Sequence, residues 1–97
     1  MDRQSDVAYT YIKMGKISEA RQILNKLLED PTQYPDSWRI ARLCILLGKK
    51  NEGFEWLERA WEDKNRALLG LKIDQDFESV RGDPRFQAML KKLGLDK

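Results

Sequence analysis

The side chains that could most readily carry out chemistry are three carboxylates at helical spacing. Glu55, Glu58 and Glu62 recur beside Arg59 and Arg66. Such a group could carry acid–base chemistry, since one carboxyl group can donate a proton while another accepts one. The same spacing describes a solvated helix face on which Glu55 and Arg59 form a favourable i,i+4 pair. Because the pattern implies neither a pocket nor a partner base, we interpret these residues as a solvated face.

Other catalytic constellations are excluded by composition. The chain has no histidine and one cysteine, so it can build neither a histidine triad nor a Cys/His zinc site. The glycine-containing segment 48–53 has the wrong spacing for a phosphate loop and no strand before it. Cys44 lies within the apolar run 43–47, which predicts a buried, unreactive thiol. We therefore expect a protein that is not an enzyme and that holds no cofactor and no metal.

The net charge and the lengths of the apolar runs indicate where the protein is located and which classes of partner it binds. The net charge is only +2, so no strong overall field favours nucleic acid or an anionic membrane. The longest apolar run, residues 43–47, is far too short to span a bilayer. The N-terminal segment 1–13 has no apolar signal-peptide region, and a single cysteine fits a reducing compartment. We expect a cytoplasmic protein without membrane association.

Apolar residues recur at helical spacing along almost the whole chain. Gly15 and Gly48 should end the first and third helices in a left-handed conformation, and Pro31 should end the second. Asn51 is expected to cap the fourth helix. No stretch alternates apolar and polar residues between turn signals, so the sequence predicts an all-α fold.

The chain repeats itself at an offset of 33 residues. The matched positions are Ala8 with Ala41, Gly15 with Gly48, Lys16 with Lys49, Glu19 with Glu52, Ala20 with Gly53, Leu24 with Leu57, and Leu27 with Ala60. A fixed period in this range indicates stacked helical hairpins that share one continuous core. We expect a single domain over residues 1–97.

The small residues at these positions and the proline after the first unit, Pro31, resemble the tetratricopeptide repeat. In that family the small residues are the contact points of two antiparallel helices, and the glycine makes the turn between them. The resemblance covers residues 4–65, as repeat one over 4–33 and repeat two over 37–65, stacked in a right-handed superhelix. The chain departs from the family in its period, which is one residue short, in the missing tryptophan of its first helix, and in Lys64, which replaces a second proline.

Residues 66–97 read as a partial third unit followed by a closing cap. Asp83 and Pro84 are typical of a helix start, and Gly94 should end that helix with Leu95 folded back. This segment resembles the C-terminal closing segment of bacterial tetratricopeptide proteins. Its apolar residues should cover the fourth helix, with Trp61 in the core and Trp56 more exposed.

The resemblance implies a concave groove lined by the first helix of each unit. On this chain the inward residues are Tyr9, Ile12, Lys13, Trp38, Arg39, Arg42 and Ile45. Trp, Tyr and Arg are the usual anchors of interfaces, and two arginines one turn apart can grip one carboxylate. The alternative is a solvated face with Trp38 under the loop 33–35. The dicarboxylate clamp of the chaperone-binding branch is not reproduced.

These features lead us to expect a non-catalytic module that holds a segment of another protein in the groove. A second interpretation is a homo-oligomer formed through the first helix or Trp56, or an end piece of a longer solenoid. A nucleic-acid-binding module using Arg39, Arg42, Lys49 and Lys50 is a third interpretation. The small net charge favours it least.

Overall fold

The computed structural model describes residues 3–29 and 37–95, and within them it contains helices and no strand. The elements are α1 (Arg3–Lys13), α2 (Ile17–Glu29), α3 (Ser37–Leu46), α4 (Lys50–Glu62), the 3-10 helices η2 (Arg66–Ile73) and η3 (Gln75–Val80), and α5 (Pro84–Lys92). The prediction of an all-α fold is confirmed. Pro31 and the loop 33–35, to which two predictions referred, lie outside the described residues. None of the described helices is both long enough and apolar enough to cross a bilayer.

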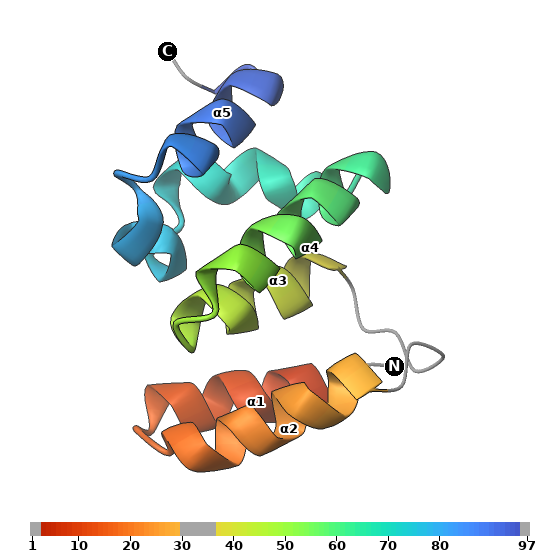
Figure 1. The fold of residues 1–97 in the computed structure, drawn as a ribbon, viewed down its shortest axis with the longest axis vertical. Helices are drawn as coiled ribbons and strands as arrows, with labels where there is room; N and C mark the ends of the chain where they lie inside the picture. The colour runs from red at the N-terminus through yellow and green to blue at the C-terminus, as the bar shows by residue number, and fades with distance from the viewer. Residues whose placement is uncertain (1–2, 30–36, 96–97) are drawn as a thin grey trace.

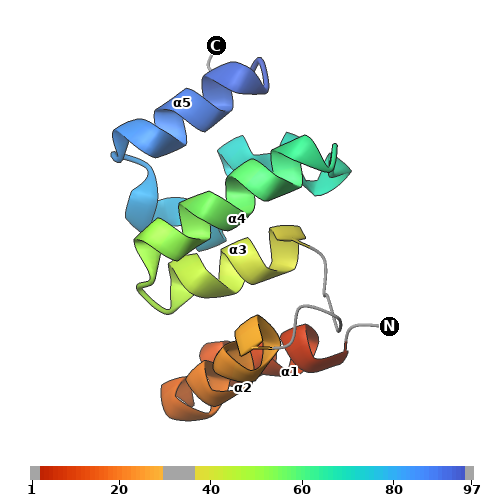
Figure 2. The same cartoon turned by 45° about the vertical axis from the view of Figure 1, so that its right-hand side comes forward.

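The helices form two hairpins and a C-terminal segment that follow one another along the long axis (Figure 1). Helix α1 packs chiefly against α2, and α3 packs chiefly against α4. The turned view places the second hairpin between the first hairpin and α5 (Figure 2). Segment η3 returns to α3, which therefore contacts both the first hairpin and the C-terminal segment.

Three helices end at a glycine with positive φ. Gly15, Gly48 and Gly94 have φ of 81°, 82° and 73°. In each case the N–H of the following residue donates to a carbonyl five residues before it, as from Lys16 to Tyr11 at 2.8 Å. This is the Schellman end, which satisfies the last carbonyls of a helix and favours glycine in the left-handed position. The predicted helix ends at these glycines are confirmed.

The helix starts confirm one prediction and correct another. The Asp83 carboxylate accepts the Arg85 N–H at 2.8 Å, and Pro84 is the first residue of α5, as predicted. The prediction that Asn51 caps α4 is wrong, because that helix already begins at Lys50 and has no side-chain cap. The Asn51 side chain instead accepts a hydrogen bond from Arg85 at 2.7 Å.

The repeated small residues lie where helices approach closely. Ala8 on α1 and Ala41 on α3 are fully buried, and so is Ala20 on α2. At Gly53, the counterpart of Ala20 on α4, an added Cβ would lie 2.5 Å from the Ile45 Cδ1 atom. A contact this short means that a side chain at position 53 would fit only if the Ile45 side chain moved. The sequence repeat therefore corresponds to two hairpins whose matched small residues are all buried.

Two apolar cores lie on opposite sides of the second hairpin. One joins α1 and α2 to one face of α3, and the other joins α3 and α4 to η2, η3 and α5. Trp56 packs against both cores and is half-buried, whereas Trp61 is 41% exposed. The prediction for these two tryptophans is wrong. Trp61 lies in the last turn of α4, where η2 and α5 stand apart and leave a hollow beside its ring.

Candidate functional site

The predicted inner face of α1 and α3 meets a carboxylate of the chain itself. The Tyr9 hydroxyl donates to Asp76 Oδ2 at 2.8 Å, and the Lys13 ammonium donates to Oδ1 at 3.0 Å. Tyr9 and Lys13 are four residues apart on α1, so they lie on the same side of the helix and reach one carboxylate together. The Asp76 side chain is only 9% exposed. These contacts tie the first hairpin to η3.

Arg42 joins this cluster from α3. Its guanidinium carbon lies 4.1 Å from the centre of the Tyr9 ring, a cation–π arrangement. Its Nε atom is 4.0 Å from Asp76 Oδ2, too far for a hydrogen bond, and it is buried without an acceptor in the described part of the chain. Two cations, Lys13 and Arg42, thus share one carboxylate, which leaves this part of the inner face with an excess of positive charge.

The conformation of η3 places Asp76 and Phe77 on the inner face. The Asp74 carboxylate caps η3 by accepting the Asp76 N–H at 2.9 Å. Phe77 then turns inward, is fully buried and stacks on Trp38 with ring centres 5.1 Å apart. An acidic and an aromatic side chain in succession are therefore held by a tyrosine, a lysine and a tryptophan of the two hairpins.

The electrostatics of Lys13 follow from this geometry. The pKa of its ammonium is raised, chiefly by the hydrogen bond to Asp76 and further by Tyr9. Both interactions favour the charged form over the neutral amine. Lys13 therefore stays a cation over the whole physiological range, and its side chain is 54% exposed.

The structure places the seven predicted residues in two groups. Trp38 and Ile45 are buried, so they support the face from beneath and do not present a surface. Ile12 is half-buried, and Arg39 is half-exposed with its guanidinium 2.9 Å from the exposed carboxylate of Asp6. The open part of the inner face is thus formed by Tyr9, Ile12, Lys13, Arg39 and Arg42. The alternative that put Trp38 under the loop 33–35 concerns a loop outside the described residues.

The other residues considered for chemistry, the carboxylates of α4 and Cys44, lie apart from the inner face. Glu58 pairs with Lys92 at 2.6 Å on the outer surface, so the carboxylate series on α4 faces α5 and solvent. Cys44 is fully buried, and burial raises the pKa of its thiol to about 12. In the described residues no three His, Cys, Asp or Glu side chains gather where they could hold a metal ion.

Asp76 and Phe77 are the site residues that sequence reasoning missed. They are far in sequence from the helices that hold them, and neither periodicity nor spacing pairs them with α1 or α3. The sequence feature that could have indicated them is the excess of cations on the inward side of these helices, since buried or half-buried cations need a carboxylate partner. Comparisons with protein-family models, with curated proteins and with solved structures find no match to this chain.

Proposed function

We propose that the chain is a non-catalytic protein–protein interaction module of the tetratricopeptide type, which holds an acidic or apolar segment of a partner on its inner face. The observation that carries the proposal is that this face holds an acidic–aromatic segment of the chain itself. Asp76 is bound by Tyr9 and Lys13, and Phe77 stacks on Trp38. A partner segment with similar chemistry would bind beside η3 along α1 and α3.

The charges on the open part of the face favour an acidic segment. Lys13 and Arg42 share the single carboxylate of Asp76, and Arg39 pairs with Asp6, which is 64% exposed. An exposed pair of this kind contributes about 0–1 kcal/mol, so Arg39 can exchange Asp6 for a partner carboxylate at little cost. Half-buried Ile12, one turn from Tyr9, adds an apolar contact between the charges.

The repeat supports the same proposal. Two hairpins with matched small residues and matched glycine ends are what the tetratricopeptide resemblance predicts, and repeat folds present extended surfaces that suit a bound segment. Rigid helices hold the anchor side chains, which limits the entropy lost on binding. The right-handed superhelical stacking remains part of this proposal.

A matched pair of charge reversals tests the function. Trp38 and Arg42 are unsuitable because both also hold the fold, whereas Arg39 and Lys26 are accessible cations on helix surfaces. Affinity capture uses the wild type, Arg39→Glu and the control Lys26→Glu as baits. The wild-type and Lys26→Glu baits should recover the same protein. The Arg39→Glu bait should lose it. Recovery by all three baits, or equal loss with both variants, would contradict the inner-face assignment.

Self-association is the second candidate function, and exposed apolar residues on the first hairpin favour it. Val7, Met14 and Ile17 are 42%, 59% and 38% exposed. An uncovered apolar face on a repeat unit is the kind of surface that a second copy or a further repeat covers. Sedimentation velocity over a concentration series should then show a dimer that Met14→Glu abolishes. A monomer at high micromolar concentration would reject this candidate.

The other two interpretations lose support. Trp56 is packed between the two cores, so it offers less surface for a homodimer than the first hairpin does. The nucleic-acid interpretation is disfavoured by the net charge of only +2, and because Arg42 packs on the Tyr9 ring and lies 4.0 Å from the Asp76 carboxylate.

A further inference from the structure

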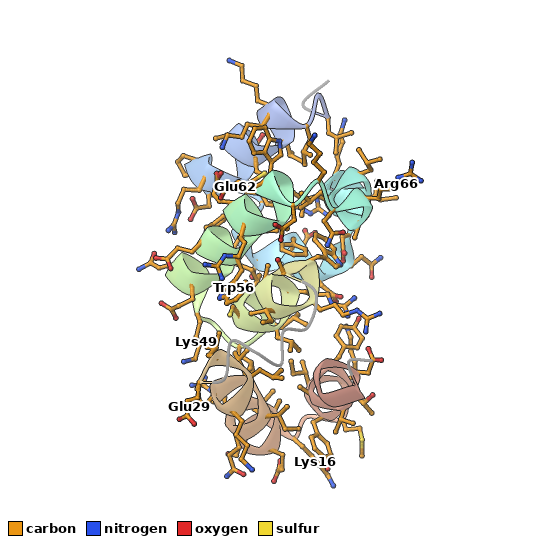
Figure 3. The ribbon with its side chains drawn as sticks, turned by 90° about the vertical axis from the view of Figure 1, so that its right-hand side faces the viewer. Lys16, Glu29, Lys49, Trp56, Glu62 and Arg66 are labelled. Atoms are coloured by element: carbon orange, nitrogen blue, oxygen red, sulfur yellow. The ribbon has the colours of Figure 1, made fainter. Side chains whose placement is uncertain are left out.

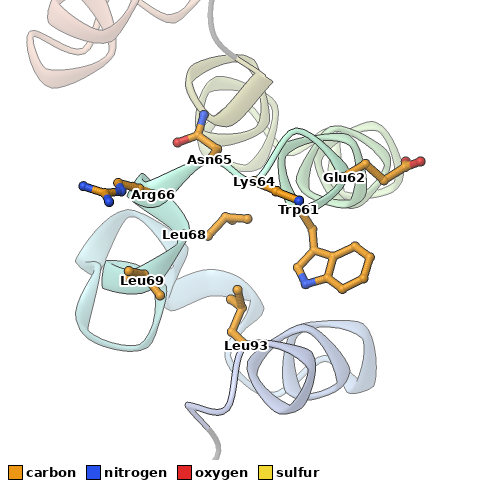
Figure 4. A pocket seen from close by; sticks show the side chains of 8 residues that line it. All are labelled: Trp61, Glu62, Lys64, Asn65, Arg66, Leu68, Leu69 and Leu93. Atoms are coloured by element: carbon orange, nitrogen blue, oxygen red, sulfur yellow. The ribbon is translucent and has the colours of Figure 1, made fainter.

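A hollow of about 360 Å³ opens between the last turn of α4, η2 and the end of α5 (Figure 4). Trp61, Leu68, Leu69 and Leu93 form its apolar wall. Leu68 is buried at its base, whereas Trp61 and Leu69 are 41% and 62% exposed. None of the inner-face residues lines this hollow, so it is a separate surface. Large exposed apolar side chains around a concave space are typical of a binding site.

The indole N–H of Trp61 gives the hollow a hydrogen-bond donor. Its ring nitrogen is on the side of the ring that faces the hollow in Figure 4. Among the described residues this N–H has no hydrogen-bond acceptor, and its polar contact there is the Lys92 ammonium, 4.8 Å above the ring centre. An indole N–H usually finds an acceptor when a site closes over it. The occupant should therefore combine an apolar group with a hydrogen-bond acceptor.

The rim of the hollow is basic. Lys64 and Arg66 line it, and neither forms an ion pair with any residue that the structure describes. Arg66 projects from η2 toward solvent (Figure 3). The one carboxylate in the lining, that of Glu62, points away from the hollow (Figure 4). Two cations beside an apolar wall are complementary to an apolar side chain flanked by carboxylates.

The rim is also held in place before any ligand binds. Lys64 has φ of 58°, and its N–H donates to the Trp61 carbonyl at 3.0 Å. The Asn65 N–H donates to the Ala60 carbonyl at 3.0 Å, while the Asn65 side chain accepts the Ala67 N–H at 2.9 Å. A rim that is already ordered loses little conformational entropy on binding.

We propose that this hollow is a second docking site, which receives one bulky apolar side chain from an acidic segment of a partner protein. The side chain packs between Trp61, Leu68 and Leu93, a backbone carbonyl of the segment accepts the indole N–H, and flanking carboxylates reach Lys64 and Arg66. The volume lies near the low end of the range of about 300–1,000 Å³ that bound ligands fill, which suits a single anchor. This site goes beyond the proposed function because it shares no residue with the inner face.

The test follows the indole resonances of the three tryptophans in the ¹⁵N-labelled full chain. The probe is an acetylated peptide with a central Leu-Phe pair between glutamates. One control peptide replaces the glutamates by lysines, and another replaces Leu-Phe by Ser-Ser. The acidic apolar peptide should shift the Trp61 indole and the amides of Lys64 and Arg66, whether or not the inner-face amides of Ile12, Lys13 and Arg39 also shift. Neither control peptide should do so.

Matched protein variants distinguish the effect of the rim cations on peptide binding from the effect of the net charge. Lys64→Glu/Arg66→Glu should weaken binding about tenfold, as expected for reversing two exposed charges, whereas the control Lys26→Glu/Lys50→Glu should change it less than twofold. Leu69→Ser, at an exposed position, should leave the fold intact and weaken binding severalfold. Circular dichroism establishes that each variant is folded.

Three results would overturn the proposal. One is an unchanged Trp61 indole at millimolar peptide, and another is equal binding of the acidic and basic peptides. The third is a Trp61 shift that depends on protein concentration alone, because a second copy of the chain would then be the occupant.

Discussion

Asp76→Ala should destabilise the fold by about 2–3 kcal/mol. The Tyr9 hydroxyl donates to this carboxylate in a partly buried setting, and a hydrogen bond to a charged group contributes roughly 1.5–3 kcal/mol. The Lys13 ammonium is half-exposed, so its bond adds at most about 1 kcal/mol. Since small domains are stable by only about 5–15 kcal/mol, the loss should lower Tm by roughly 10–20 °C.

Urea unfolding followed by circular dichroism measures this change. The matched control is Glu78→Ala on the same 3-10 helix, because Glu78 is 73% exposed and should cost less than about 0.5 kcal/mol. Tyr9→Phe alone should cost about 1–2 kcal/mol, and it should add little once Asp76 is gone, since both variants remove the same bond. Equal stability of the Asp76 and Glu78 variants, or additive effects of the Tyr9 and Asp76 variants, would show that the Tyr9–Asp76 hydrogen bond does not stabilise the fold.

Three further predictions concern other parts of the chain. Lys64→Gly should raise the free energy of unfolding by about 0.5–1 kcal/mol, because Lys64 has φ of 58° where glycine carries no steric cost; an unchanged urea midpoint would contradict this. The thiol of Cys44, with its pKa raised to about 12 by burial, should react with a disulfide reagent at pH 8 only as fast as the chain unfolds; immediate modification of the folded protein would show it to be accessible. The side-chain and backbone hydrogen bonds from Arg85 lower the pKa of Asp83 below its ordinary 3.8, so its contribution to stability is present above pH 3.8 and is lost as the pH falls through the lower, folded value. The stability advantage of the wild type over Asp83→Asn, which keeps a capping side chain, should therefore shrink below pH 3.8, and a pH-independent difference would contradict this.

The parts of the fold that depend on neighbours in sequence were predictable. Gly15, Gly48 and Gly94 end helices because a left-handed residue is needed directly after the last turn, and this requirement is local. Asp83 caps α5 for the same reason. The 33-residue repeat also fixed which small residues lie at the helix contacts, because equivalent positions of a repeat occupy equivalent environments.

The site could not be predicted, because it is formed by contacts between residues far apart in sequence. Asp76 meets Tyr9 because η3 returns to the inner face, and the 3-10 turns that bring it back follow no apolar periodicity. Trp61 was expected in the core beneath the closing segment. It is exposed because η2 and α5 stand apart at the end of α4 and leave a hollow beside its ring.

Chemical-shift mapping tests most directly whether the inner face binds an acidic segment. The ¹⁵N-labelled chain is titrated with a peptide rich in Asp and Phe, and with the same peptide carrying Lys in place of Asp. We predict that only the acidic peptide shifts the amides of Ile12, Lys13 and Arg39, and that Arg39→Glu reduces these shifts while Lys26→Glu does not. No shift at these amides at millimolar peptide, or shifts confined to the hollow beside Trp61, would contradict this prediction.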